Sequence, residues 1–257
     1  MNERMRIRDL AKETMEYAQS DEMQRRRKLW TNHNSLEFAY PPVYIRAIPF
    51  HEFIDKNEIK CQTPTLRSLE INFLMNRYRM KLYDDTIIEP WVVVRAHLKS
   101  SPLGVYGMPA HLSDKVPGGA AKFMPSILKE EDIEKLHVMD YEVDEKVTKE
   151  RFDHLNDLIG DIMPVEVDRQ GILSSMWVND ISTILAQLRG LEQIMWDVYD
   201  RPAWLHRLLS FMQSKILMHM EQTESANGFK LINHQNQAMP YARELQPPAA
   251  GKGSVSA

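Results

Sequence analysis

The stretch PTLRSLEINFLMNRYRMKLYDDTIIEPWVVVRA, residues 64–96, predicts a helix that leads into a buried strand. Within 65–83 the apolar residues recur at broadly helical spacing, and arginine and lysine fill the opposite side. Pro64 falls in the first turn, where proline is tolerated, and Thr63 can cap the helix. The run 86–94 that follows is apolar and rich in β-branched residues. It is typical of a strand covered on both faces, as in a parallel sheet.

Length and composition restrict the class of protein. The chain has 257 residues, 43% of them hydrophobic and 26% charged, which is enough apolar mass for a real core. That length fits one large domain or two small ones. The net charge of -4 gives no general attraction for nucleic acid or for an anionic membrane surface, so neither is expected as a partner.

The cysteine content and the N-terminus predict a cytoplasmic protein. Cys61 is the single cysteine, which excludes an internal disulfide and fits a reducing compartment. It also excludes a zinc site with two thiolates from this chain, and no His-x-x-x-His or His-Glu-x-x-His spacing is present. The first residues, MNERMRIRDLAKE, lack the apolar core of a secretory signal. No run approaches the ~20 apolar residues of a membrane-spanning helix.

Helical and strand-like segments are expected to alternate along the rest of the chain. Residues 3–30 predict one amphipathic helix or two short ones, and the basic run 25–28 is interpreted as a solvated face. A segment rich in proline and glycine, 98–125, is expected to be irregular. Its Gly118-Gly119 pair lacks the spacing of a phosphate-binding loop.

This alternation predicts a parallel sheet wrapped by helices, one of them over 181–199. The expected strands are residues 43–48, 86–94, 162–168 and 229–233. Only these four fit, although the chain has the length of a complete eight-strand barrel. We expect an N-terminal helical extension at 1–40, a partial barrel at 41–240 and a disordered tail at 241–257.

Several short motifs, taken in order, resemble the uroporphyrinogen decarboxylase superfamily. The segment YIRAIP at 44–49 stands in the place of the family's Met-Arg-Gln-Ala-Gly-Arg-like segment. A proline-led helix with an Arg-Tyr pair at 77–78 follows, and the next strand carries Glu89 where the family has an aspartate. Later, VYDRP at 198–202 and HRLL at 206–209 are similar to the family's Tyr-x-x-Pro and His-x-Leu-Leu junction.

The resemblance covers roughly residues 25–240 and implies an α/β fold of the (β/α)8 TIM-barrel type, present as about its first four strands. The family contains decarboxylases that hold the carboxylates of a tetrapyrrole with arginines and use no cofactor. It also contains relatives that transfer methyl groups between a corrinoid and a thiol or another acceptor, often with zinc. The late strands, which carry the catalytic histidine or the zinc ligands, would lie beyond Ala257. The chain is therefore expected to be truncated, inactive alone and without zinc.

Two departures weaken the decarboxylase interpretation, and the first of them, the incomplete arginine pair, favours the methyltransferase branch. The second arginine of the decarboxylase motif is absent, with Phe50-His51 nearby, and Met176 and Trp177 stand where a tyrosine is expected. We therefore expect corrinoid-dependent methyl transfer, with a corrinoid as methyl donor and a small molecule or a corrinoid protein as substrate. A tetrapyrrole decarboxylase-type lyase and a non-catalytic fragment or interaction subunit are the alternatives.

Candidate site residues follow from the expected barrel, in which functional side chains stand at the C-terminal ends of the strands. Glu89 and His234 are candidates for catalysis, and Arg46, Asp168 and Arg169 for substrate binding. Arg46 either clamps a substrate carboxylate or forms an internal ion pair with Glu89. Glu89 either transfers a proton or ligates a metal, or it is a structural carboxylate.

The remaining candidates carry alternatives of their own. Asp168 and Arg169 are adjacent and would face apart on a strand, so one of them is expected in a loop. His234 is either a proton donor or ligand, or a hydrogen-bonded loop residue. An incomplete barrel leaves one strand edge open, which predicts self-association through that edge.

Overall fold

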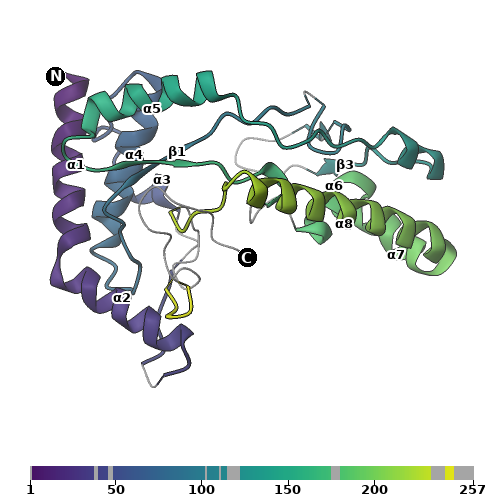
Figure 1. Cartoon of the computed structure of the whole chain (residues 1–257), viewed down its shortest axis with the longest axis horizontal. Helices are drawn as coiled ribbons and strands as arrows, with labels where there is room; N and C mark the ends of the chain where they lie inside the picture. The colour runs from purple at the N-terminus through teal and green to yellow at the C-terminus, as the bar shows by residue number, and fades with distance from the viewer. Residues whose placement is uncertain are drawn as a thin grey trace. The chain divides into compact units, whose positions relative to one another are not determined.

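The computed structural model describes residues 2–37, 40–45, 49–101, 103–109, 111–114, 122–174, 180–232 and 241–245. The chain forms two compact units, each with its own hydrophobic core (Figure 1). Unit 1 contains residues 1–95, 146–168 and 230–251, and unit 2 contains residues 96–145, 169–229 and 252–257. Both units are thus assembled from segments that are distant in sequence.

Unit 1 is built mainly from four helices, α1 (Glu3–Gln19), α2 (Asp21–Asn34), α4 (Pro64–Arg79) and α5 (Glu145–Ile159). A single turn, α3 (Phe50–Phe53), precedes α4. Ser20 ends α1 and caps α2, because its hydroxyl accepts the Met23 amide at 3.4 Å. Apolar side chains of α1, α4 and α5 form the core: Ile7, Leu10, Leu69, Phe73, Leu74, Leu155, Leu158 and Ile159.

The predicted helix of the central stretch is confirmed, but it ends at Arg79 rather than near residue 83. Pro64 stands in the first turn of α4, as expected. Thr63 occupies the cap position without capping the helix through its side chain, since its hydroxyl donates to Glu3 at 2.8 Å. The N-terminus of α4 is therefore tied to α1.

The sheet of unit 1 has two strands, β1 (Val92–Arg95) and β4 (Val165–Asp168). They pair in parallel, with Val92 opposite Val165 and Arg95 opposite Asp168. Helix α5 lies in the connection between them, and Val94 and Val165 join the core that α1, α4 and α5 share.

The prediction of a (β/α)8 barrel is wrong. In the described part of the chain, β1 and β4 make up the whole parallel sheet, and the other sheet is an antiparallel pair, β2 (His111–Leu112) and β3 (Phe123–Met124). The expected second and third strands exist in shortened form, as β1 and β4. Residues 43–45 and 229–232 form no strand, and 46–48 and 233 lie outside the described residues.

Side chains of α2 explain why β1 is short. Arg26 donates to the Thr86 carbonyl oxygen at 2.7 Å. Arg27 donates to the Ile88 carbonyl oxygen at 3.0 Å. Pro90 has no amide hydrogen to give to a neighbouring strand. These arginines satisfy the carbonyl oxygens of Thr86 and Ile88, so those residues need no neighbouring strand. Pairing with β4 begins only at Val92.

Unit 2 contains three consecutive helices, α6 (Ile181–Arg189), α7 (Leu191–Asp200) and α8 (Pro202–Ser225). The β2–β3 pair and two 3-10 helices, Glu130–Lys135 and Ile172–Ser174, complete it. Its core includes Tyr106, Ile127, Leu173, Leu185, Leu188, Trp204, Leu208 and Met212. Helix α8 supplies the long apolar face that holds these segments together.

Gly190 divides the single helix expected over 181–199 into α6 and α7. Its φ is +83°, a conformation that glycine adopts without the steric cost of a Cβ atom. A Cβ atom there would also lie 2.8 Å from Cγ of Pro125. The chain therefore turns sharply at this residue.

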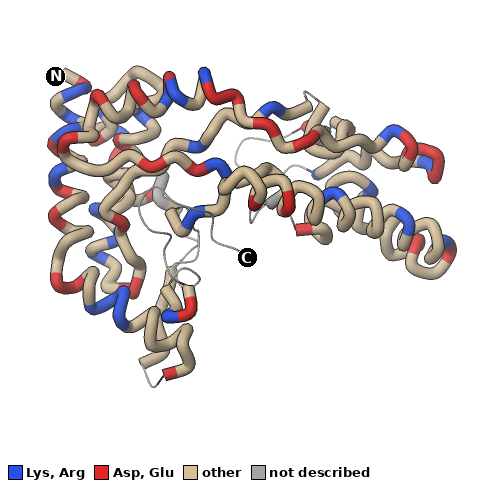
Figure 2. The backbone as a smooth tube through the Cα atoms, viewed as in Figure 1, with Lys and Arg blue, Asp and Glu red and all other residues tan. Residues whose placement is uncertain are grey.

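Charges of both signs are interspersed along the helices (Figure 2). None of the helices in the described part of the chain combines the length and the apolar character that crossing a lipid bilayer requires.

Candidate functional site

Glu89 and Asp168 lie at opposite ends of the two-stranded sheet. Glu89 precedes β1, so it stands at the amino end of that strand. Asp168 is the last residue of β4, it is buried, and it lies opposite Arg95. The expected gathering of both residues at the C-terminal strand ends is therefore not found.

Glu89 is held by a cation and a phenol. Tyr241 donates its hydroxyl hydrogen to Oε1 of Glu89 at 2.6 Å. Nη2 of Arg27 lies 3.6 Å from Oε2 of Glu89, and Nε of Arg27 donates to the Tyr241 oxygen at 3.4 Å. Burial, followed by the charge of Glu89, raises the pKa of Tyr241. The phenol therefore stays protonated and acts as a donor at neutral pH.

A groove of about 510 Å³ lies beside this cluster, in unit 1. Arg27, Trp91 and Glu166 line it, together with the glutamines of α1 and α2. The indole of Trp91 donates to the Ile232 carbonyl oxygen at 2.9 Å, so its ring is fixed in the wall. The groove thus presents a guanidinium, a carboxylate and an aromatic side chain.

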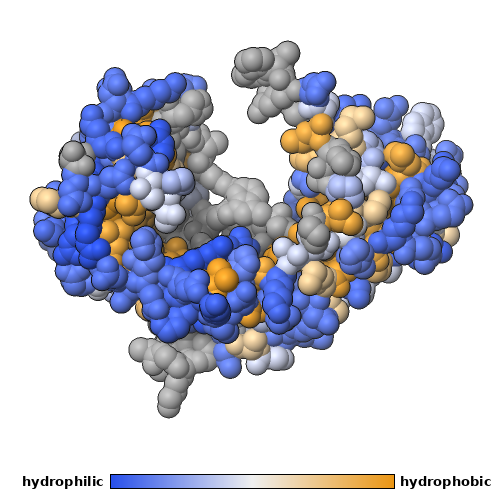
Figure 3. Space-filling model, turned by 90° about the horizontal axis from the view of Figure 1, so that it is seen from above, coloured by the Kyte–Doolittle hydropathy of each residue, from blue (hydrophilic) through white to orange (hydrophobic). Residues whose placement is uncertain are grey.

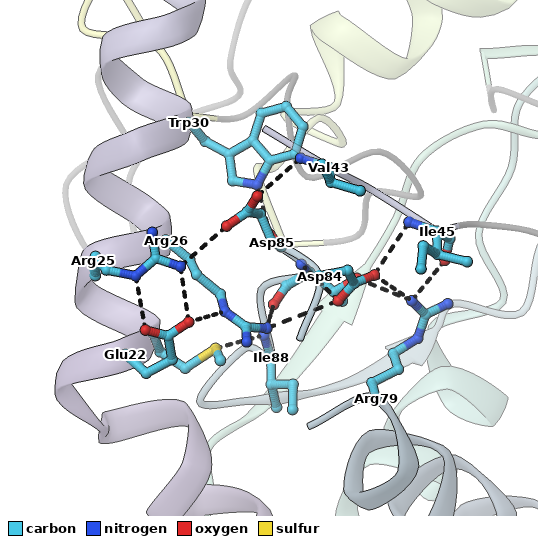
Figure 4. A network of polar contacts seen from close by, with 12 residues as sticks. Glu22, Arg25, Arg26, Trp30, Val43, Ile45, Arg79, Asp84, Asp85 and Ile88 are labelled. Atoms are coloured by element: carbon cyan, nitrogen blue, oxygen red, sulfur yellow. Dashed lines mark hydrogen bonds and ion pairs between the residues drawn. The ribbon is translucent and has the colours of Figure 1, made fainter. Parts of the chain in front are cut away.

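A second polar cluster of unit 1 surrounds the buried carboxylate of Asp84 (Figure 4). Nη1 of Arg26 lies 3.9 Å from Asp84, and Nη1 of Arg79 lies 4.0 Å from it. The Thr86 hydroxyl donates to Asp84 at 2.6 Å. Arg26 is also fully enclosed and donates to Glu22 at 2.7 Å. The interpretation of residues 25–28 as a solvated face is wrong for Arg26.

This cluster fixes the segment that precedes Arg46. The Ile45 amide donates to Asp84 at 3.1 Å, and the Ile45 carbonyl oxygen accepts from Arg79 at 3.0 Å. The Val43 amide donates to Asp85 at 2.9 Å. The Val43 carbonyl oxygen accepts from the Asp85 amide at 2.7 Å. Charged side chains and this one backbone hydrogen bond thus take the place of a neighbouring strand over 43–45.

Arg46 and His234 lie outside the described residues, so their expected roles stay predictions. Arg169 follows β4 and belongs to unit 2, which agrees with the expectation that one of the Asp168–Arg169 pair lies in a loop. Its guanidinium pairs with Glu145 at 2.7 Å. Its carbonyl oxygen accepts from the Tyr141 hydroxyl at 2.8 Å.

Sequence reasoning missed three residues that organise these clusters: Arg27, Asp84 and Tyr241. A signal existed for Asp84, because a carboxylate directly before a buried apolar run needs partners. The basic run 25–28 could have supplied them. Tyr241 gave no signal, since it falls within the segment expected to be a disordered tail.

Within the described residues, no group of three or more histidine, cysteine, aspartate and glutamate side chains is arranged to hold a metal ion. Comparisons of this chain with models of protein families, with curated proteins and with solved structures found no match.

Proposed function

We propose that this chain supplies part of a cytoplasmic uroporphyrinogen decarboxylase-like protein of the corrinoid methyl-transfer branch, and that it is catalytic only when further strands extend its sheet. The motif order over residues 44–49, 77–89 and 198–209 supports the family. We do not propose the eight-strand barrel, because the described sheets have two strands each.

The two-stranded parallel sheet of β1 and β4 is the observation that carries the need for further strands. Parallel strands occur almost always in larger sheets whose faces are both covered. A two-stranded sheet is marginal by itself. In the described part of the chain β1 and β4 pair only with each other, so each offers an edge to a strand from elsewhere.

Arg46 is assigned to binding an anionic group of the substrate or the corrinoid. The preceding residues, 43–45, are held by Asp84, Asp85 and Arg79. A guanidinium binds a carboxylate or phosphate through paired, charge-assisted hydrogen bonds. The contacts of Glu89 with Arg27 and Tyr241 favour its structural alternative, which leaves His234 as the proton-transfer candidate.

Titration of the full chain with methylcobalamin, followed by absorbance, tests this proposal. We expect binding without turnover in the presence of a thiol, and at least a tenfold weaker binding for Arg46→Ala. Arg151→Ala, which removes an exposed arginine of α5, is the matched control and should bind as the unchanged chain does. Absence of binding refutes the corrinoid assignment. Decarboxylation of a porphyrinogen would instead establish the lyase alternative, and methyl transfer by the chain alone would refute the need for further strands.

A further inference from the structure

Helix α7 turns most of its apolar side chains outward and places a carboxylate, Asp197, inward. Its one fully buried residue is Asp197. Five of its large apolar side chains are at least half exposed: Leu191 at 68%, Met195 at 62%, Trp196 at 60%, Val198 at 50% and Tyr199 at 83%. Ile194, by contrast, packs partly buried against the core of unit 2. Scattered exposed apolar residues are ordinary, but five on one ten-residue helix form a contiguous surface. We name these five side chains the α7 face.

A buried ion pair fixes this orientation of the helix. Arg189 pairs with Asp197 through two contacts, at 2.7 and 3.0 Å. The Arg189 guanidinium also donates to the Ile127 and Leu128 carbonyl oxygens, and it lies 4.8 Å from the centre of the Trp204 ring. Turning α7 over would break this pair and bury unpaired charges, which is strongly unfavourable. The outward α7 face is therefore a property of the fold of unit 2.

A groove of about 640 Å³ adjoins the α7 face, between β3, α6 and α7 of the same unit. Phe123, Leu191 and Trp196 give it apolar walls, and Lys122 and Glu192 place opposite charges at its rim. Orange apolar patches stand out among the blue surface in Figure 3. Unit 2 thus offers an exposed apolar helix face next to a groove with partly apolar walls.

We propose that the α7 face and this groove form a two-fold interface with a second copy of this chain. A two-fold contact uses the same surface on both partners and therefore requires self-complementarity. Leu191, Met195 and Val198 have the four-three spacing of a helix seam. Antiparallel packing of two α7 helices opposes their dipoles, which favours this arrangement.

The area of the α7 face agrees with this occupant. Large side chains offer on the order of 150–250 Å² each, so five of them at these exposures contribute roughly 500–800 Å² per copy. A stable specific interface buries about 800 Å² per partner. The groove walls, including Phe123 at 40% exposure, add to the apolar area, so the surface is large enough for a stable dimer.

Sedimentation equilibrium of the full chain tests the proposal. We expect a mass twice the 30.0 kDa of one chain, and at least a tenfold higher dissociation constant for Met195→Glu, because a charge would enter the apolar seam. Leu217→Glu is the matched control, since Leu217 is 49% exposed on α8 and should leave the dimer unchanged. A monomer at all concentrations overturns the proposal. An oligomer that persists in Met195→Glu also overturns it. Such an oligomer would indicate association through another surface, for example the edges of β1 and β4.

Cross-linking provides a second measurement that does not depend on a destabilising charge. The single native cysteine, Cys61, is fully buried and gives little background. Met195→Cys should yield a covalent dimer with a short bis-maleimide, whereas Leu217→Cys should not. The opposite pattern, or cross-linking of neither variant, contradicts the α7 interface.

Discussion

At the scale of single residues, the buried carboxylate of Asp84 is the strongest determinant of the polar cluster in unit 1. It lies near two guanidinium groups and accepts hydrogen bonds from the Ile45 amide and the Thr86 hydroxyl. Removing one partner from a buried ion pair leaves the remaining charge uncompensated. Asp84→Asn should therefore lower the free energy of unfolding by about 3–5 kcal/mol, measured by urea denaturation.

Asp157→Asn is the control for that substitution. Asp157 pairs with Arg4 at 2.8 Å, but its side chain is 75% exposed, and such surface pairs contribute little to stability because water screens them. Equal losses in the two variants would contradict the special role of the Asp84 cluster.

Because the cluster also holds residues 43–45, Asp84→Asn should weaken methylcobalamin binding as Arg46→Ala does.

At the scale of elements, the turn between α6 and α7 depends on Gly190. Gly190→Ala forces a Cβ atom into a positive-φ conformation and against Pro125, 2.8 Å away. Strain of this kind costs about 1–3 kcal/mol. We expect a correspondingly lower urea midpoint. Adding Pro125→Ala should recover only the part that the steric contact causes, and complete recovery would show that the backbone conformation costs nothing.

The helices could be predicted from the sequence, whereas most of the sheet could not. The spacing of the apolar residues and Pro64 were sufficient to predict α4, because both signals are local in the sequence. The runs 43–48 and 86–94 have the composition of strands, but composition does not reveal what satisfies the backbone. Here Arg26, Arg27 and Asp84 do so, and a charged side chain that bonds to a distant backbone leaves no periodic trace.

The candidate site was predictable only in part, for the same reason. Glu89 stood out because it interrupts an apolar run, and the structure gives it partners. Its partner Tyr241 follows it by 152 residues, a separation that no local pattern can bridge. The inverted α7 also escaped prediction, since its apolar spacing is that of an ordinary core-facing helix.

At the scale of the whole molecule, carboxylates with lowered pKa values occur in both units and link stability to pH. Hydrogen bonds from Arg25 lower the pKa of Glu22 to about 2, and those from Arg8 lower the pKa of Asp161 to about 2. In unit 2, hydrogen bonds from Ser182 and Thr183 lower the pKa of Asp180 to about 2. Each of these groups binds a proton less readily in the folded chain than in the unfolded chain.

Folding is therefore expected to weaken in acid. A carboxylate whose pKa is lower in the folded state contributes stability above its unfolded pKa, near 4, and loses it as the pH falls toward about 2. Between pH 7 and 6 these carboxylates stay ionised in both states, so they should not change the urea midpoint. Below pH 5 the midpoint should fall steadily. The double variant Glu22→Gln and Asp161→Asn should begin less stable at pH 7 and lose less between pH 5 and 3. A midpoint that does not change down to pH 3 in the unchanged chain would contradict the lowered pKa values, because protons would then bind both states alike.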